Sequence, residues 1–261
     1  MTQSGKMRGA VIILYFVGFL IETSIENVTY KTQPKIIGGQ AIDIKYRPFM
    51  LSLHNSLGFL CGASIIGRTW VLTALHCLKF PELPSEYHVR AGSNKTNKDG
   101  SVHKVTNIYV YNQTNIQYKL QHDIALLEVK PSFRFSRTIR PARLPRSNHR
   151  IKHQLLVCGW GYINAGIEKV AQTLMGVYVE YVPFEMCVKI SSIYATLVKS
   201  DYHLCYGTQG KDACNGDSGG PLASKRTIYG IVSFGQGCGF VSGVYVKVSY
   251  YLDWIKAITN L

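Results

Sequence analysis

Ser218 lies in a glycine-rich segment, Asp212-Ala-Cys-Asn-Gly-Asp-Ser-Gly-Gly-Pro221, that could support nucleophilic catalysis. A serine hydroxyl becomes an effective nucleophile only where a neighbouring base removes its proton. Acyl transfer also needs hydrogen-bond donors aimed at the oxygen that becomes negative. Glycines at 216, 219 and 220 would let the backbone turn tightly, so that amide N–H groups could converge beside Ser218. Taken alone, however, this run could equally be an ordinary turn.

Two further segments contain the partners that such a serine needs. Thr73-Ala-Leu-His-Cys77 places a candidate base at His76, and His122-Asp-Ile-Ala-Leu-Leu127 places a carboxylate at Asp123 that could orient the imidazole. A single histidine after a strand is more often structural than catalytic, and so is an aspartate that opens one. The combination of all three segments is what indicates chemistry.

The three segments resemble the catalytic motifs of the trypsin/chymotrypsin family of serine proteases, in the order His, Asp, Ser. The resemblance runs from Ile36 to Leu261, with further matches at Pro48, Cys61-Gly62, Trp70, Cys158-Gly-Trp-Gly161, Ser233-Phe-Gly235 and Gly243-Val-Tyr245. It implies that His76 is the general base for Ser218 and later protonates the leaving amine, while Asp123 orients the imidazole. It also implies an oxyanion hole made by the backbone N–H groups of Gly216 and Ser218. No metal or organic cofactor is needed for this chemistry.

The same resemblance implies a trypsin-like specificity pocket. Asp212, six residues before the serine, matches the pocket floor that selects arginine and lysine, and Ala213 stands where many trypsins have a serine that helps to bind lysine. Arginine is therefore expected to be preferred. The other predicted substrate-binding residues are Ser233, Phe234, Gly235 and Gly243, with Phe234 replacing the usual tryptophan. Chymotrypsin-like specificity is a competing interpretation, which Asp212 disfavours. A second is a non-catalytic basic binding protein on a protease scaffold, although such proteins usually lose the histidine or the serine.

The N-terminal region is predicted to be removed in stages. Lys6 and Arg8 precede an uncharged run from Gly9 to Ile21, which suits a signal-peptide core, whereas a membrane span needs roughly 20 residues. An uncleaved signal anchor is the alternative. The resemblance implies activation by cleavage between Lys35 and Ile36, after which the new α-ammonium group of Ile36 would pair with Asp217. The predicted organisation is a signal peptide at 1–23, a propeptide at 24–35, a first β-barrel at 36–145 carrying His76 and Asp123, and a second at 146–261 carrying Ser218.

Seven cysteines follow the predicted signal peptide, and in a secreted protein they indicate disulfides with one thiol left over. A metal site is the competing interpretation, but no pair has C-x-x-C spacing. The resemblance implies the bridges Cys61–Cys77, Cys187–Cys205 and Cys214–Cys238, and leaves Cys158 as a buried, inert thiol. A calcium loop would lie near residues 93–100, where Asp99 is the only carboxylate, so no calcium site is expected. Three sequons, at Asn27, Asn94 and Asn112, predict glycosylated loops.

Short alternating apolar segments separated by turn residues indicate an all-β fold of the barrel or sandwich type. They lie at 49–54, 69–74, 87–91, 108–111, 124–129, 155–159, 173–182, 228–234 and 243–247, and residues 249–261 show helical spacing. The resemblance implies two packed six-stranded antiparallel β-barrels, with the triad in the cleft between them and a C-terminal helix.

The chain carries a formal net charge of +14, and since residues 1–35 hold four basic and two acidic residues, the remainder carries +12. Such an excess would attract sulfated glycans, anionic membranes or acidic proteins, although solvated lysines with no dedicated partner are the simpler interpretation. The expected partners are protein or peptide substrates and an activating trypsin-like protease. Protein inhibitors of proteases and polyanions are further candidates. Neither nucleic acid binding nor a membrane span is expected. The protein is expected to be a secreted, extracellular monomer.

Overall fold

The computed structural model describes residues 39–79, 83–111, 120–164, 167–211, 213–237 and 240–261. The predicted signal peptide, propeptide and Lys35–Ile36 cleavage site lie outside these residues, as do Asp212, Cys238, Asn27 and Asn112. Among the described residues, no helix is both long and apolar enough to cross a membrane.

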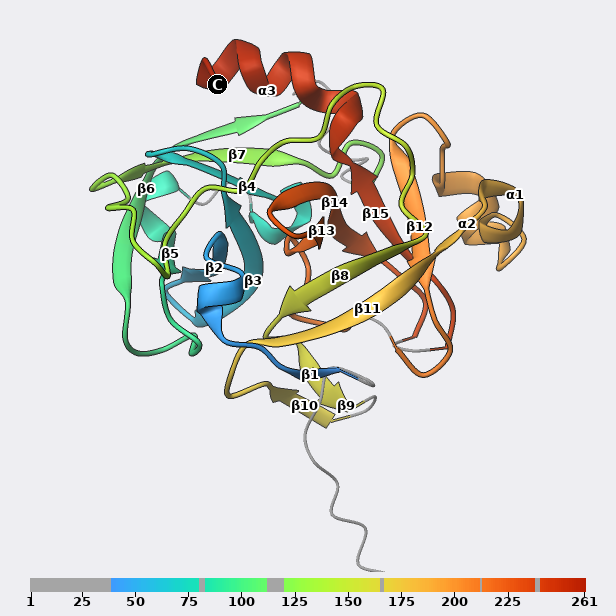
Figure 1. Ribbon diagram of the computed structural model, residues 1–261, viewed down its shortest axis with the longest axis horizontal. Helices are drawn as coiled ribbons and strands as arrows, with labels where there is room; N and C mark the ends of the chain where they lie inside the picture. The colour runs from blue at the N-terminus through green and yellow to red at the C-terminus, as the bar shows by residue number, and fades with distance from the viewer. Residues whose placement is uncertain (1–38, 80–82, 112–119, 165–166, 212, 238–239) are drawn as a thin grey trace, which may run out of the picture. The chain divides into compact units, whose positions relative to one another are not determined.

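Six antiparallel strands in the first half of the described chain close into a barrel (Figure 1). These strands are β2 (Met50–Asn55), β3 (Gly58–Ile65), β4 (Trp70–Thr73), β5 (His88–Ala91), β6 (Ser101–Val110) and β7 (Ala125–Lys130). Their order is β2-β3-β4-β7-β6-β5, and the pairing of β2 with β5 closes the ring. Closure leaves no exposed sheet edge, and the interior is filled by apolar side chains such as Leu51, Val89 and Leu126.

The second half forms another closed antiparallel ring, in the order β11-β12-β15-β14-β13-β8, with β8 paired back to β11. Its strands are β8 (Gln154–Gly159), β11 (Met175–Val182), β12 (His203–Gly207), β13 (Pro221–Ser224), β14 (Thr227–Phe234) and β15 (Gly243–Lys247). The short strand β1 (Gln40–Ala41) pairs with the outside of this ring at β11, and β9 (Tyr162–Asn164) pairs with β10 (Ile167–Val170). The predicted fold of two six-stranded barrels is thereby confirmed.

The predicted C-terminal helix is also present, as α3 (Leu252–Thr259) after the 3-10 turn η5 (Val248–Tyr251). Its buried residue Ile255 packs, with Tyr251, into a core that combines side chains from both barrels, including Leu126 and Ile228. Further 3-10 turns among the described residues are η1 (Ile44–Tyr46), η2 (Leu75–Cys77) and η3 (Pro84–Glu86). The short helices α1 (Phe184–Cys187) and α2 (Ser192–Leu197) were not predicted, because one or two turns are too short to display a helical apolar period.

Candidate active site

Antiparallel pairing of β4 with β7 places His76 and Asp123 side by side. Thr73, the last residue of β4, pairs with Ala125, the first of β7, so that η2 and Asp123 lie just beyond the same end of the pair. The Asp123 carboxylate accepts the His76 backbone N–H at 2.8 Å and lies 2.7 Å from the ring Nδ1. Because a carboxylate accepts, Nδ1 carries the proton of this hydrogen bond, which leaves Nε2 as the ring nitrogen that can act as a base.

A third donor to Asp123 comes from the second barrel. The Ser233 hydroxyl, on β14, donates to the Asp123 oxygen that also faces His76. Asp123 is fully buried, and a buried carboxylate needs such donors to offset its lost hydration. Ser233 was predicted as a substrate-binding residue, but the sequence carries no local signal for this side-chain contact, which joins positions 110 residues apart.

Tight turns surround Ser218. Gly216 and Gly219 adopt left-handed backbone conformations, with φ angles of 94° and 74°. The Asp217 and Gly220 N–H groups close the turn onto the carbonyls of Cys214 and Asp217, both at 2.9 Å. The N–H groups of Gly216 and Ser218, by contrast, donate to no acceptor within the described part of the chain. The two N–H groups assigned to the oxyanion hole are thus not used by another acceptor among the described residues, and their role stays a prediction.

His76 and Ser218 line one cavity of about 430 Å³. Five predicted pocket residues line it with them: Ala213, Ser233, Phe234, Gly235 and Gly243. Leu120 and Asn215, which sequence reasoning did not identify, also contribute. No hydrogen bond joins Ser218 to His76 across the described residues, and such bonds commonly tighten only when substrate binds. Asp212 lies outside the described residues, so the predicted pocket floor stays a prediction.

Asp217 is fully buried behind the serine turn. Its two carboxylate oxygens accept the N–H groups of Gly161 at 2.8 Å and Cys214 at 2.9 Å. Burial raises the pKa of Asp217 to about 6, since the hydrogen bonds offset only part of the lost hydration. A Cβ atom on Gly159 or on Gly161 would collide with the Asp217 carboxylate, which explains physically why the Cys-Gly-Trp-Gly segment has these two glycines.

Two disulfides are formed between the described cysteines: Cys61–Cys77 and Cys187–Cys205. Cys214 is also disulfide-bonded, and its predicted partner lies outside the described residues. Cys158 is a free, fully buried thiol whose pKa is raised to about 12 by burial.

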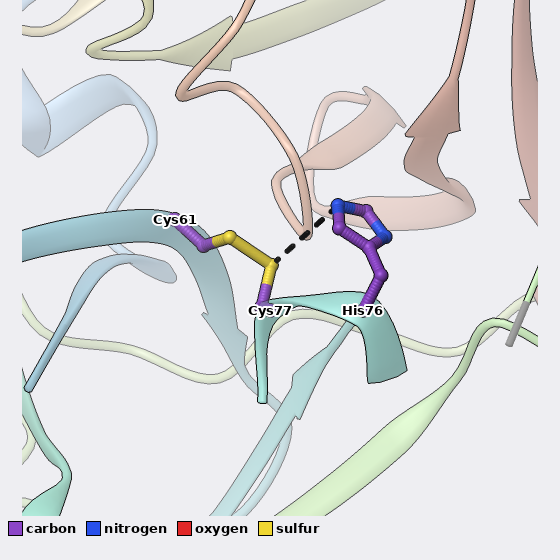
Figure 2. Close-up of side chains that lie close together, drawn as sticks. All are labelled: Cys61, His76 and Cys77. Carbon is purple, nitrogen blue, oxygen red and sulfur yellow. Dashed lines mark hydrogen bonds between the residues drawn. A yellow bond between two sulfur atoms is a disulfide. The ribbon is translucent and has the colours of Figure 1, made fainter. Parts of the chain in front are cut away.

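Figure 2 shows His76 beside the first of these disulfides, which joins η2 to β3. His76 Nε2 lies 4.0 Å from the Cys77 sulfur. The three side chains are grouped closely enough for metal ligands, but the disulfide uses both sulfurs. Because thiolates are the form of cysteine that binds metals, this group does not make a metal centre, and the bridge anchors the turn carrying His76.

Comparisons with known proteins agree with this geometry. The family model described as Trypsin matches residues 36–255. The chain is 32% identical over 252 residues to Trypsin epsilon of Drosophila erecta, covering 96% of this chain and 97% of that relative. It is 33% identical over 237 residues to Trypsin alpha of Drosophila melanogaster, covering 90% and 91%. It is 32% identical over 259 residues to a trypsin of Phaedon cochleariae, covering 96% and 98%. The chain therefore belongs to the trypsin family and is a trypsin-like serine endopeptidase.

Proposed function

We propose that this protein is a secreted endopeptidase, made as an inactive precursor, that cleaves peptide bonds after arginine and, less efficiently, after lysine. The observation that carries the proposal is that Ser218 lines one cavity together with His76, whose ring pairs with the buried Asp123 carboxylate.

In the proposed mechanism, Ser218 Oγ attacks the carbonyl carbon of the substrate while His76 Nε2 takes its proton. The oxygen that becomes negative accepts hydrogen bonds from the N–H groups of Gly216 and Ser218. His76 then gives its proton to the leaving amine, and an acyl-enzyme remains. Water, activated by His76 in the same way, hydrolyses this ester. Asp123 holds the imidazole in the required tautomer throughout.

Specificity for basic residues is supported by the residues around the cavity. Gly235 and Gly243 line it without side chains, leaving room for a long substrate side chain. A carboxylate at Asp212 would be left unpaired by an apolar substrate and would therefore reject it. Ala213 also lines the cavity and offers no hydroxyl to a lysine ammonium group, whereas the arginine fork can still make two bonds to a carboxylate. The relatives are named trypsins, which supports the same specificity.

Matched arginyl, lysyl and phenylalanyl amide substrates test the proposal on the activated enzyme. We expect kcat/KM for arginine to exceed that for lysine several-fold, because one lost hydrogen bond is worth about 1 kcal/mol. Ala213→Ser should narrow that ratio, while Ser218→Ala should abolish turnover. Equal kcat/KM for the lysyl and arginyl substrates would refute the argument from Ala213. A higher kcat/KM for the phenylalanyl substrate would refute the proposed specificity for basic residues. Absence of turnover by the activated enzyme would favour the non-catalytic alternative.

Activation is proposed to follow cleavage between Lys35 and Ile36. Asp217 supports this part of the proposal, because its buried carboxyl has no cationic partner among the described residues and has a raised pKa. The α-ammonium group of Ile36 would supply that partner beside the serine turn. Removing one member of such a buried pair typically costs about 3–5 kcal/mol.

The remaining partners follow from this activity and from the charge. A trypsin-like protease would perform the activating cleavage, and protein inhibitors could occupy the same cavity as substrates. The net charge of +12 beyond residue 35 supports an affinity for polyanions.

A further inference from the structure

A second cavity, of about 640 Å³, is lined almost entirely by cationic side chains. We name it the basic cavity; its residues are Lys45, Tyr46, Arg47, Pro48, Arg137, Arg140, Lys225 and Arg226. It shares no residue with the cavity that contains His76 and Ser218. Six of its eight residues are lysine or arginine, so that much of the excess positive charge is concentrated at one place.

Three segments distant in sequence build the basic cavity: η1 with the residues after it, the connection between the barrels, and the turn between β13 and β14. Backbone hydrogen bonds fasten them together. The Arg140 N–H donates to the Pro48 carbonyl at 2.8 Å, and the Arg143 N–H donates to the Arg226 carbonyl at 2.7 Å. The cationic side chains therefore project from a backbone framework that is already assembled.

Carboxylates compensate little of this charge. Within the described ranges, Lys45 is the only one of the six with an ion-pair partner, Asp43 at 2.8 Å. Backbone carbonyls position three guanidinium groups instead: Arg47 donates to Tyr46 at 2.6 Å, Arg140 to Ser136 at 2.9 Å and Arg226 to Pro141 at 2.7 Å. Carbonyls orient a guanidinium group but do not neutralise it, so the mutual repulsion of these cations persists.

Two of these guanidinium groups also keep unused donors. The Nε atoms of Arg47 and Arg226 are buried and lack a hydrogen-bond partner. Arg47 also lies near enough to the buried Cys158 thiol to influence its pKa, which burial raises to about 12, so that the thiol is neutral at ordinary pH. These groups around the Arg47 guanidinium are thus uncharged, and they position it without neutralising its charge.

We propose that the basic cavity binds a polyol ring carrying several sulfate or phosphate groups, such as one unit of a sulfated glycan. A planar guanidinium group matches two oxygens of a tetrahedral oxyanion, and several fixed cations favour a ligand with several anionic groups. A volume of about 640 Å³ accommodates a sugar-sized ring. The inference rests on the proposed affinity for polyanions and gives it a definite location.

Occupancy would have two consequences. Since the cavity joins the segment before the first barrel to the connection and to a turn of the second, a bound polyanion should raise Tm by binding only the folded chain. Since the two cavities share no residue, turnover of small amide substrates should be unchanged at saturating polyanion.

The test uses the full chain with Ser218→Ala, which prevents self-digestion, and two probes: a heparin tetrasaccharide and inositol hexakisphosphate. Calorimetric titration gives Kd, and thermal unfolding gives the shift in Tm. The variant Arg137→Gln/Lys225→Gln removes two exposed cations whose side chains make no hydrogen bond or ion pair to any other described residue. The control Arg150→Gln/Lys256→Gln removes the same charge at exposed positions outside the cavity.

We expect the cavity variant to weaken Kd at least tenfold for one or both probes and the control to weaken it less than about threefold. Tighter binding of the tetrasaccharide would identify sulfate groups as the source of the recognised anions, and tighter binding of the inositol compound would identify phosphate groups. Equal weakening by the two variants would overturn the site while leaving a diffuse affinity for polyanions. Failure of both probes to bind the parent chain would overturn both the basic cavity as a polyanion site and the proposed affinity for polyanions.

Discussion

At the scale of single residues, Asp123 is the side chain on which most of the site's geometry depends. Its two oxygens receive the His76 backbone N–H, the His76 ring and the Ser233 hydroxyl. Three donors fix the carboxylate so that it can hold the ring in one tautomer and one orientation. Ser233 is therefore a positioning residue for Asp123, in addition to lining the cavity.

The variant Ser233→Ala should lower kcat about tenfold with little change in KM for a small amide substrate. The alanine leaves the buried carboxylate short of one donor, and a hydrogen bond to a charged group is worth about 1.5–3 kcal/mol. Ser52→Ala is the matched control, because Ser52 is also buried and its hydroxyl bonds to His54 at 2.9 Å, away from the cavity. Steady-state kinetics of both variants, which give kcat and KM separately, test whether Ser233 acts by positioning Asp123. A rise in KM at constant kcat would instead assign Ser233 to substrate binding alone.

At the scale of elements, β3 of the first barrel supports the serine turn of the second. The Gly62 N–H donates to the Ser218 carbonyl at 2.8 Å, and the Thr73 hydroxyl donates to the Gly62 carbonyl at 2.9 Å. A Cβ atom on Gly62 would lie 2.8 Å from the Cα atom of Gly220, which is closer than such atoms can approach. This glycine is what allows strand and turn to meet.

Gly62→Ala should therefore displace the serine turn and lower kcat/KM by about 100-fold, since misplacement of reacting groups by about 1 Å is that costly. Gly67→Ala, just after the same strand, is the control. There a new Cβ would meet only side-chain atoms of Trp70 and Leu261, at 3.2 Å or more. Activity that survives in Gly62→Ala would show that the turn keeps its geometry without this support.

The sequence predicted the elements with a clear period and the residues within recognisable motifs. Apolar alternation predicted segments that overlap nine of the twelve barrel strands, and helical spacing predicted α3. The strands β3, β12 and β13 were not among the predicted segments. The contact of Ser233 with Asp123 and that of Gly62 with Gly220 join distant positions, which no local pattern encodes. The resemblance identified the Cys-Gly-Trp-Gly motif without giving its cause, because the need for its glycines appears only once Asp217 lies against them.

At the scale of the whole molecule, the free energy of unfolding should respond differently to pH before and after the proposed activation cleavage. In the uncleaved chain, burial raises the pKa of Asp217 from 3.8 to about 6, so the folded state holds this proton more tightly than the unfolded state. The resulting contribution to the free energy of unfolding is fully present below pH 3.8 and is lost as pH rises through about 6. Its size is roughly 3 kcal/mol. An α-ammonium group beside Asp217 would lower the pKa of this carboxyl, so the free energy of unfolding would no longer fall as pH rises through about 6.

Denaturant unfolding at pH 4.5 and pH 7 would test this in the Ser218→Ala background, before and after cleavage by an added trypsin. The cleaved chain should begin Ile-Ile-Gly-Gly, and only the uncleaved chain should lose stability from Asp217 on going to pH 7. Burial lowers the pKa values of His54 and His203 to about 4, so these residues make the free energy of unfolding rise with pH instead. Because both forms of the chain contain them, their contribution cancels when the pH profiles of the two forms are subtracted. Parallel profiles for the two forms would contradict pairing of Ile36 with Asp217.

The division of the site between two barrels also makes assembly of the active site depend on the folding of both halves of the chain. His76 and Asp123 belong to the first barrel and Ser218 to the second, and the core beneath them mixes Leu126 with Ile228. A nascent or half-folded chain therefore possesses a nucleophile or a base, but not both in register. Proteolytic activity should therefore arise only once both barrels have folded and packed together.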